Sequence, residues 1–114
     1  MPYLKIQTNR EMAENIRQEV LKKASVLVSK NLGKPEKYVM VRLDPAHPMM
    51  FAGSALPCVY LELKSIGLPA SSTESLSKML CQLMLDELKI PPERVYIEFA
   101  DAKASMWGWD SGTF

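Results

Sequence analysis

The sequence is poor in the residues that bind metals or form disulfides. It contains one histidine, His47, and two cysteines, Cys58 and Cys81, which stand 23 positions apart. Metal sites and redox motifs need such residues in closer groups, for example as CxxC pairs. We therefore expect neither a metal site nor a redox-active thiol pair, and we expect His47 to lie in an exposed loop.

The sequence also lacks an excess of charge and any long apolar run. The formal net charge is +1 at pH 7, and no dense stripe of lysine and arginine is present. This balance gives no electrostatic reason to expect nucleic acid as a partner. No apolar run approaches the roughly 20 residues that span a bilayer. The first residues do not form the apolar segment of a secretory signal, so we expect no membrane insertion and a cytoplasmic location.

What the sequence does contain is an internal repeat. The stretch PYLKIQT at 2–8 matches VYLELKS at 59–65, and PEKYVMVRL at 35–43 matches PERVYIEFA at 92–100. Both matches have the same offset of 57 positions, which is half of the 114 residues. A shared offset at two separate places predicts a duplicated unit, covering approximately 2–57 and 58–114. The length suits one domain, 1–114.

The first copy has the pattern of a strand, a helix and a second strand. Apolar side chains alternate over 2–8, as in a half-buried strand. They recur at spacings of three and four over 11–32, as on one face of a helix. Gly33 is expected to end this helix in a left-handed conformation, and Pro35 prevents its continuation. The second strand is expected over 38–43.

The second copy repeats this order. A strand is expected over 58–65, a helix up to about Leu88, and a final strand over 95–100. The sequence SSTE at 71–74 predicts a capping box, in which Ser71 and Glu74 each bind a free amide at the helix start.

Two such units predict an α+β, two-layer protein. Four strands form one mixed sheet, and both helices cover one face of it, because strand–helix–strand crossovers are right-handed. The face opposite the helices is polar and partly aromatic, and it includes Tyr3, Lys5, Gln7, Met40, Arg42, Tyr60, Glu62, Lys64 and Glu98. Such a face can meet water or line the interior of an oligomer. The tail MWGWDSGTF is apolar enough to pack on its own domain or on a neighbour.

Several short motifs now point to a known family. They are a proline directly after Met1 at the head of a strand, then GKPEKYVMV, FAG, PC, SIG, ERVYI and GWDSGTF. Together and in this order, they resemble the macrophage migration inhibitory factor branch of the tautomerase superfamily. The resemblance covers essentially the whole chain. It implies a homotrimer in which three sheets surround a solvent channel, with each active site between two subunits.

The resemblance also implies a reaction and the residues that perform it. The reaction is keto–enol tautomerisation of arylpyruvates such as phenylpyruvate, without a cofactor. Pro2, freed by removal of Met1, matches the catalytic base, and Lys34 matches the lysine that binds the substrate carboxylate. The backbone amide of Ile66 matches a second carboxylate contact. The positions that match the aromatic walls of the pocket are Tyr38, Tyr96, Trp109 and Phe114.

Four positions depart from the family pattern, and one of them is Lys64, which replaces a histidine on the sheet. Trp107 stands where the animal proteins usually have a small aliphatic residue, which predicts a narrower pocket mouth. Glu98 stands where they have an asparagine that bonds a substrate hydroxyl, and an ionised glutamate accepts hydrogen bonds but does not donate them. Leu61 replaces the second cysteine of a CxxC motif, so thiol–disulfide activity is not expected.

The chemistry of an amino-terminal proline suits this reaction. A base that moves a proton next to a carbonyl must be unprotonated near neutral pH. Burial and a nearby cation both lower the pKa of an amine, and an aromatic pocket with Lys34 close by supplies both. The plainer interpretations are that Pro2 only starts a strand, and that Lys34 only complements the dipole of the preceding helix.

Two further functions remain open at this stage. One is signalling through a cell-surface receptor, as in animal members of the family, with an incidental tautomerase site and export by a route that needs no signal peptide. The other is tautomerisation of a different small keto acid or of a dopachrome-like substrate. The base and the carboxylate-binding lysine are both present, which favours the enzyme.

Overall fold

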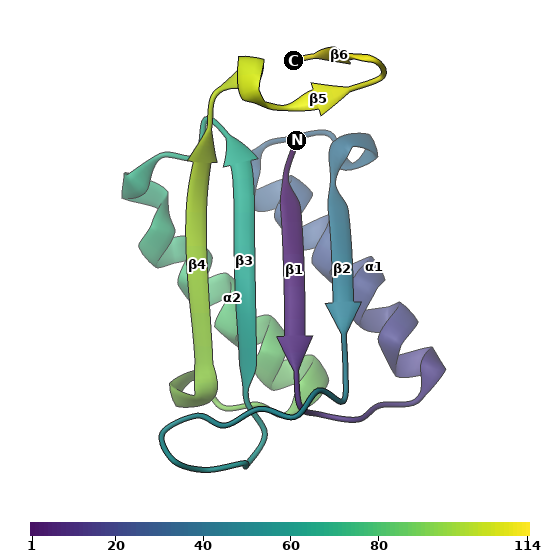
Figure 1. Cartoon of the computed structure of the whole chain (residues 1–114), viewed down its shortest axis with the longest axis vertical. Helices are drawn as coiled ribbons and strands as arrows, with labels where there is room; N and C mark the ends of the chain where they lie inside the picture. The colour runs from purple at the N-terminus through teal and green to yellow at the C-terminus, as the bar shows by residue number, and fades with distance from the viewer.

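The computed structural model describes all residues, 1–114. Each half of the chain folds as strand, helix and strand (Figure 1). The first half contains β1 (Tyr3–Thr8), α1 (Glu14–Leu32) and β2 (Met40–Asp44). The second contains β3 (Val59–Ile66), α2 (Thr73–Leu88) and β4 (Val95–Ala102). A short hairpin of β5 (Gly108–Trp109) and β6 (Gly112–Thr113) ends the chain.

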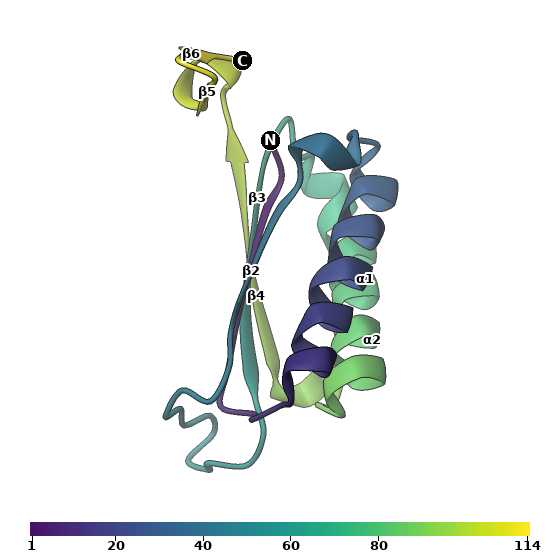
Figure 2. The same cartoon turned by 90° about the vertical axis from the view of Figure 1, so that its right-hand side faces the viewer.

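The four long strands form one mixed sheet in the order β2-β1-β3-β4. β1 pairs with β2 in parallel, β3 pairs with β4 in parallel, and β1 and β3 run antiparallel at the centre. Both helices lie on the same face of this sheet (Figure 2). The expected α+β fold is thereby confirmed, including the mixed sheet and the position of the helices. No helix is long and apolar enough to cross a membrane.

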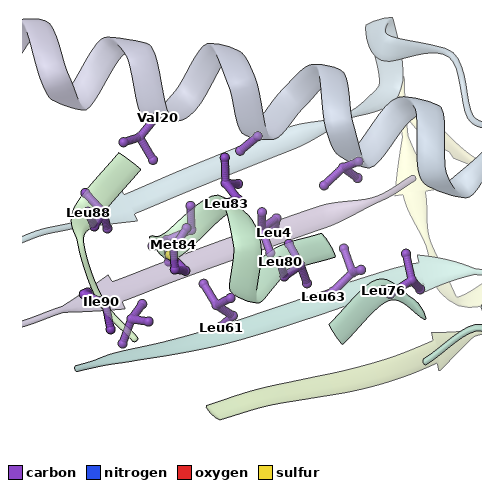
Figure 3. Packing of buried hydrophobic residues seen from close by; sticks show 14 of the residues in the cluster. Leu4, Val20, Leu61, Leu63, Leu76, Leu80, Leu83, Met84, Leu88 and Ile90 are labelled. Carbon is purple, nitrogen blue, oxygen red and sulfur yellow. The ribbon is translucent and has the colours of Figure 1, made fainter. Parts of the chain in front are cut away.

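The core lies between the sheet and the helices (Figure 3). Alternate residues of the central strands point into it, so Leu4 and Ile6 are fully buried. The helix α1 contributes Val20, Ala24 and Val28, spaced four apart on one side. Fully burying one such Leu, Ile or Val side chain contributes about 2 kcal/mol. This layer fixes the strand register, which in turn decides which side chains stand on the open face of the sheet.

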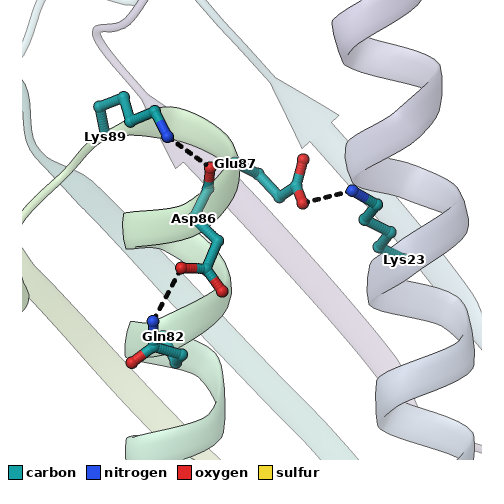
Figure 4. Close-up of polar contacts among 5 residues, drawn as sticks. All are labelled: Lys23, Gln82, Asp86, Glu87 and Lys89. Carbon is teal, nitrogen blue, oxygen red and sulfur yellow. Dashed lines mark hydrogen bonds and ion pairs between the residues drawn. The ribbon is translucent and has the colours of Figure 1, made fainter.

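The helices are also linked by polar contacts at their outer surface (Figure 4). Lys23 Nζ of α1 donates to Glu87 Oε1 of α2 at 2.6 Å. Within α2, the Gln82 amide donates to Asp86, and Lys89 Nζ donates to the Asp86 carbonyl. Exposed ion pairs of this kind contribute little to stability, so the packing of the apolar faces holds the helices in place.

The ends of the first helix agree in part with the sequence pattern. Gly33 ends α1 with φ of 63°, as expected. The helix begins at Glu14 rather than near residue 11. The second strand begins at Met40 rather than at residue 38, because Pro35 starts a 3₁₀ turn, Glu36–Tyr38, closed by Val39 N–H donating to the Glu36 carbonyl.

The capping box predicted at 71–74 is wrong. Ser71 lies inside a 3₁₀ turn, Ala70–Ser72, that leads directly into α2, and no side chain caps the helix. The Ser72 N–H instead donates to the Pro69 carbonyl, and the Thr73 hydroxyl donates to the Ala70 carbonyl. A capping box needs an extended residue before the helix, and the 3₁₀ turn removes it.

Candidate active site

A cavity of about 450 Å³ lies at the end of the sheet where both chain termini meet (Figure 1). It is built by the start of β1, the turn before β2, the end of β3 and the terminal hairpin. The residues that line it are Met1, Pro2, Tyr3, Lys37, Tyr38, Val39, Met40, Lys64, Trp107, Gly108, Trp109 and Phe114. Five of the predicted site residues are therefore brought together in one chain: Pro2, Tyr38, Trp107, Trp109 and Phe114.

One hydrogen bond of Pro2 and one of Met1 hold the start of the chain at the edge of this cavity. The Pro2 carbonyl accepts from Met40 N–H at 3.0 Å, which continues the pairing of β1 with β2. The Met1 amine donates to the Tyr38 carbonyl at 2.9 Å. Pro2 itself is buried. Removing Met1 would turn the Pro2 nitrogen from an amide into a secondary amine at the same place in the fold.

Three aromatic rings form a wall of the cavity. The Tyr38 ring meets Trp109 and Phe114 edge-on, with centroid distances of 5.4 and 5.6 Å. The Trp109 and Phe114 rings stack on each other at 5.4 Å. The Phe114 N–H donates to the Trp107 carbonyl and closes the terminal hairpin over the chain start. The wall offers flat apolar surface to an aromatic ligand.

The electrostatics of the cavity favour an anion. Its lining includes the cations Lys37 and Lys64 but no aspartate or glutamate. Lys34 does not line it, yet its charge acts on the amino terminus: burial first, and then Lys34, lower the pKa of the Met1 amine below its ordinary value of 8.0. An amine held here is therefore more often unprotonated near neutral pH than an exposed one.

The other predicted site residues lie elsewhere in the single chain. Tyr96 pairs with Tyr60, four residues along β3 from Lys64. At roughly 3.3 Å per residue, this places Tyr96 on the order of 13 Å from the level of the Pro2 cavity. Tyr96 packs against Phe51 instead, with a centroid distance of 4.5 Å. Ile66 ends β3 at the Pro2 end of the sheet, but it does not line the cavity.

Glu98 belongs to a polar cluster on the open face of the sheet. It lies opposite Glu62 in the pairing of β3 with β4. The Tyr60 hydroxyl lies 2.6 Å from Glu98 Oε2 and 3.0 Å from Glu62 Oε1. The hydrogen bond to Glu98 is the main reason why the pKa of Tyr60 is raised above its ordinary value. The phenol therefore stays protonated and donates to one of the two carboxylates.

Two other cavities combine fewer of the side chains that a catalytic site needs. A groove of about 570 Å³ between α1 and α2 is lined by apolar side chains and by the paired Lys23 and Glu87. Another, of about 710 Å³, contains His47, which is exposed as expected. No group of three or more histidine, cysteine or acidic side chains could hold a metal ion.

Comparison with known proteins agrees with the motifs. The model of the macrophage migration inhibitory factor (MIF) family matches residues 1–114. The chain belongs to this family. A macrophage migration inhibitory factor homologue from Brugia malayi is 44% identical over 115 residues, which cover 100% of this chain and 99% of that protein. The rat macrophage migration inhibitory factor is 35% identical with the same coverage.

Solved structures of family members have the same fold. The homologue from Prochlorococcus marinus superposes with a TM-score of 0.92 at 39% identity, over 98% of each chain. The protein from Trichinella spiralis gives 0.91 at 31% identity, over 98% of this chain and 99% of that one. The family resemblance inferred from the motifs is confirmed by these matches.

The sequence analysis did not identify two lysines that line this cavity, Lys37 and Lys64. Lys37 lies within the 3₁₀ turn that positions Tyr38, and Lys64 pairs with Tyr3 across β1 and β3. The sequence placed Lys64 only on the polar face of the sheet. Lys64 lies beside Pro2 because β1 and β3 pair in antiparallel orientation. These strands belong to different repeats, and the sequence pattern of one repeat does not predict how it pairs with the other.

Proposed function

We propose that the cavity at Pro2 is the active site of a cofactor-independent keto–enol tautomerase that acts on phenylpyruvate or a similar arylpyruvate. The observation that supports this most is the position of the amino terminus. It lies among aromatic rings and beside cations, in a cavity that no aspartate or glutamate of the same chain lines, where the pKa of an amine is lowered.

In the proposed reaction, Met1 has been removed and the Pro2 amine is unprotonated. Its nitrogen takes a proton from the carbon next to the substrate carbonyl, and the electron pair of that bond forms the enolate. The protonated Pro2 amine then returns the proton, directly or through water, to the enolate oxygen, so Pro2 is again unprotonated and the net change is an isomerisation. Lys34 holds the substrate carboxylate, which orients the carbon toward Pro2, and its charge also stabilises the enolate. The aromatic ring of the substrate packs against Tyr38, Trp109 and Phe114.

The remaining predicted residues belong to the same proposal in an oligomer. Tyr96 and Glu98 are remote from Pro2 in their own chain. We propose a homotrimer in which a neighbouring subunit brings these two side chains to the cavity mouth, beside Trp107. The Ile66 amide, near the end of β3, then gives the substrate carboxylate a second contact.

The test is the rate of ketonisation of enol phenylpyruvate by protein whose intact mass shows that Met1 is absent. Pro2→Gly keeps an amino terminus but replaces the secondary amine with a more flexible primary one. General bases contribute a factor of about 100 to 10,000, so we expect kcat/KM to fall at least about 100-fold. Pro92→Gly, at a turn far from the cavity, is the control and should keep its activity. Full activity in Pro2→Gly would show that another group is the base.

A further inference from the structure

The cavity at Pro2 has more positive charge than a substrate with one carboxylate requires. Lys34 acts on the amino terminus from outside the lining, and Lys37 and Lys64 lie in the lining itself. Within one chain no acidic side chain lines the cavity to neutralise them, and the Glu98 that the proposed neighbour contributes stands at the mouth beside Trp107, not beside Lys64. We infer that the site accepts doubly anionic aryl keto acids, and that Lys64 binds the second anionic group. This inference rests on the proposed tautomerase function.

Lys64 is placed to meet such a group. It stands on β3 directly opposite Tyr3, the residue after Pro2, so it borders the cavity from the open face of the sheet. Its side chain is 47% exposed, and its ammonium is therefore accessible to a ligand that enters from solvent. A second acidic group on the substrate, away from the reacting carbon, would lie near this ammonium.

The partner of Lys64 within the chain holds it only weakly. Lys64 Nζ lies 3.7 Å from Glu62 Oε2, which is longer than a charge-assisted hydrogen bond. The Glu62 carboxylate also lies 3.0 Å from the Tyr60 hydroxyl, whose one proton is shared between Glu62 and Glu98. An exposed pair at this distance contributes little, so a substrate anion can take the lysine from Glu62 at low cost.

Lys37 is less suited to the same role. Its Nζ lies 5.0 Å from the centroid of the Tyr38 ring, so its charge already interacts with the aromatic wall. Lys34 is assigned to the carboxylate of the keto acid. Of the three lysines, Lys64 is therefore the one without another strong partner. The second anionic group that it binds is expected to be a carboxylate or phosphonate on the substrate ring.

The experiment compares phenylpyruvate with 4-carboxyphenylpyruvate in three proteins. These are the wild type, Lys64→Gln and the control Lys5→Gln, which removes the same charge from the same sheet face, next to Glu62 but outside the cavity lining. In the wild type, we expect a lower KM for the dianion. In Lys64→Gln, the ratio of kcat/KM for dianion over monoanion should fall about tenfold, mostly through KM, because an exposed charge-assisted contact is lost. Lys64→Arg should restore the ratio.

A binding measurement separates this inference from the proposed function. The chain has two tryptophans, Trp107 and Trp109, and both line the cavity, so their fluorescence reports on its occupancy. Terephthalate, a dianion, should bind more tightly than benzoate in the wild type and in Lys5→Gln, but not in Lys64→Gln.

The outcomes are distinct. Absence of Pro2-dependent turnover with both keto acids would overturn the tautomerase, whatever the fluorescence shows. Turnover with the same dianion-to-monoanion ratio in the wild type and Lys64→Gln would overturn the role of Lys64 alone. An equal fall of the ratio in Lys5→Gln would also overturn it, since the effect would then come from the general charge of the sheet.

Discussion

At the scale of residues, the amino terminus is the group whose properties depend most on its surroundings. Burial and the charge of Lys34 lower the pKa of the Met1 amine below 8.0. The folded state therefore binds this proton less tightly than the unfolded chain does. Below the folded pKa the amine opposes folding, and this effect fades as the pH rises toward 8.0, so its contribution to stability increases with pH in that window.

Removing the nearby charge should reverse part of this shift. We predict that Lys34→Gln raises the pKa of the Met1 amine, because burial remains but the repulsion between the two cations is lost. Lys30→Gln removes the same charge from the last turn of α1 and should leave this pKa unchanged. An NMR titration of the labelled amino terminus measures both variants. An unchanged pKa in Lys34→Gln would remove the electrostatic basis for an activated amine here.

At the scale of elements, the two helices end in the same backbone conformation with different residues. α1 ends at Gly33 with φ of 63°, and α2 ends at Lys89 with φ of 58°. Glycine adopts this conformation without strain, whereas in other residues the Cβ atom makes it less favourable. The Lys89 N–H still donates to the carbonyls of Met84 and Leu85, so the turn is complete despite the strain.

This difference predicts opposite effects on stability. Lys89→Gly should increase the free energy of unfolding by about 0.5–1 kcal/mol, because relief of the left-handed strain exceeds the entropy cost of glycine. Gly33→Ala should decrease it by about 1 kcal/mol at the matching position of α1. Urea denaturation of both variants measures the change. A loss of stability in Lys89→Gly would mean that its Nζ contact to the Asp86 carbonyl outweighs the strain.

Much of this element structure could be predicted because it follows from periodic patterns. The alternation of Leu4 and Ile6 is explained by a half-buried strand. The glycine at position 33 is explained by the left-handed end of a helix. The capping box failed because its four residues fit a cap and a 3₁₀ turn equally well, and only the preceding chain decides between them. The left-handed Lys89 gave no signal, since lysine is common at helix ends for other reasons.

The candidate site could be predicted only for residues that have a motif. Pro2, Tyr38 and the terminal aromatic residues lie together as the family resemblance implied. Lys64 was not foreseen at the cavity because its place depends on pairing between the two repeats. Tyr96 and Glu98 lie away from Pro2 within the chain, so their predicted role depends on a second subunit and is not tested by one chain.

At the scale of the whole molecule, the open sheet face and the terminal hairpin leave large apolar side chains exposed. Met40 and Tyr96 are each 66% exposed, and Trp109 is 53% exposed. Met40 and Trp109 border the Pro2 cavity, whereas Tyr96 lies at the other end of β4. Apolar groups gathered at both ends of one face are typical of surfaces that meet another subunit.

We therefore predict a stable homotrimer in solution. Sedimentation equilibrium should give three times the chain mass of 12.9 kDa at micromolar concentration. Tyr96→Lys should weaken the assembly, because it places a charge where apolar surface is expected to be buried, while Lys22→Gln on the outer helix face should not. A monomer at all concentrations would contradict the shared active site.

The most direct test of the central claim concerns Met1. A single preparation that retains Met1 is assayed for phenylpyruvate tautomerisation before and after treatment with methionine aminopeptidase, with intact mass confirming each state. The two states differ only in the presence of Met1, which lines the cavity, and therefore in whether the Pro2 nitrogen is an amide or an amine. We predict that turnover is absent before treatment and present after it. Equal turnover in both states would contradict the assignment of Pro2 as the base.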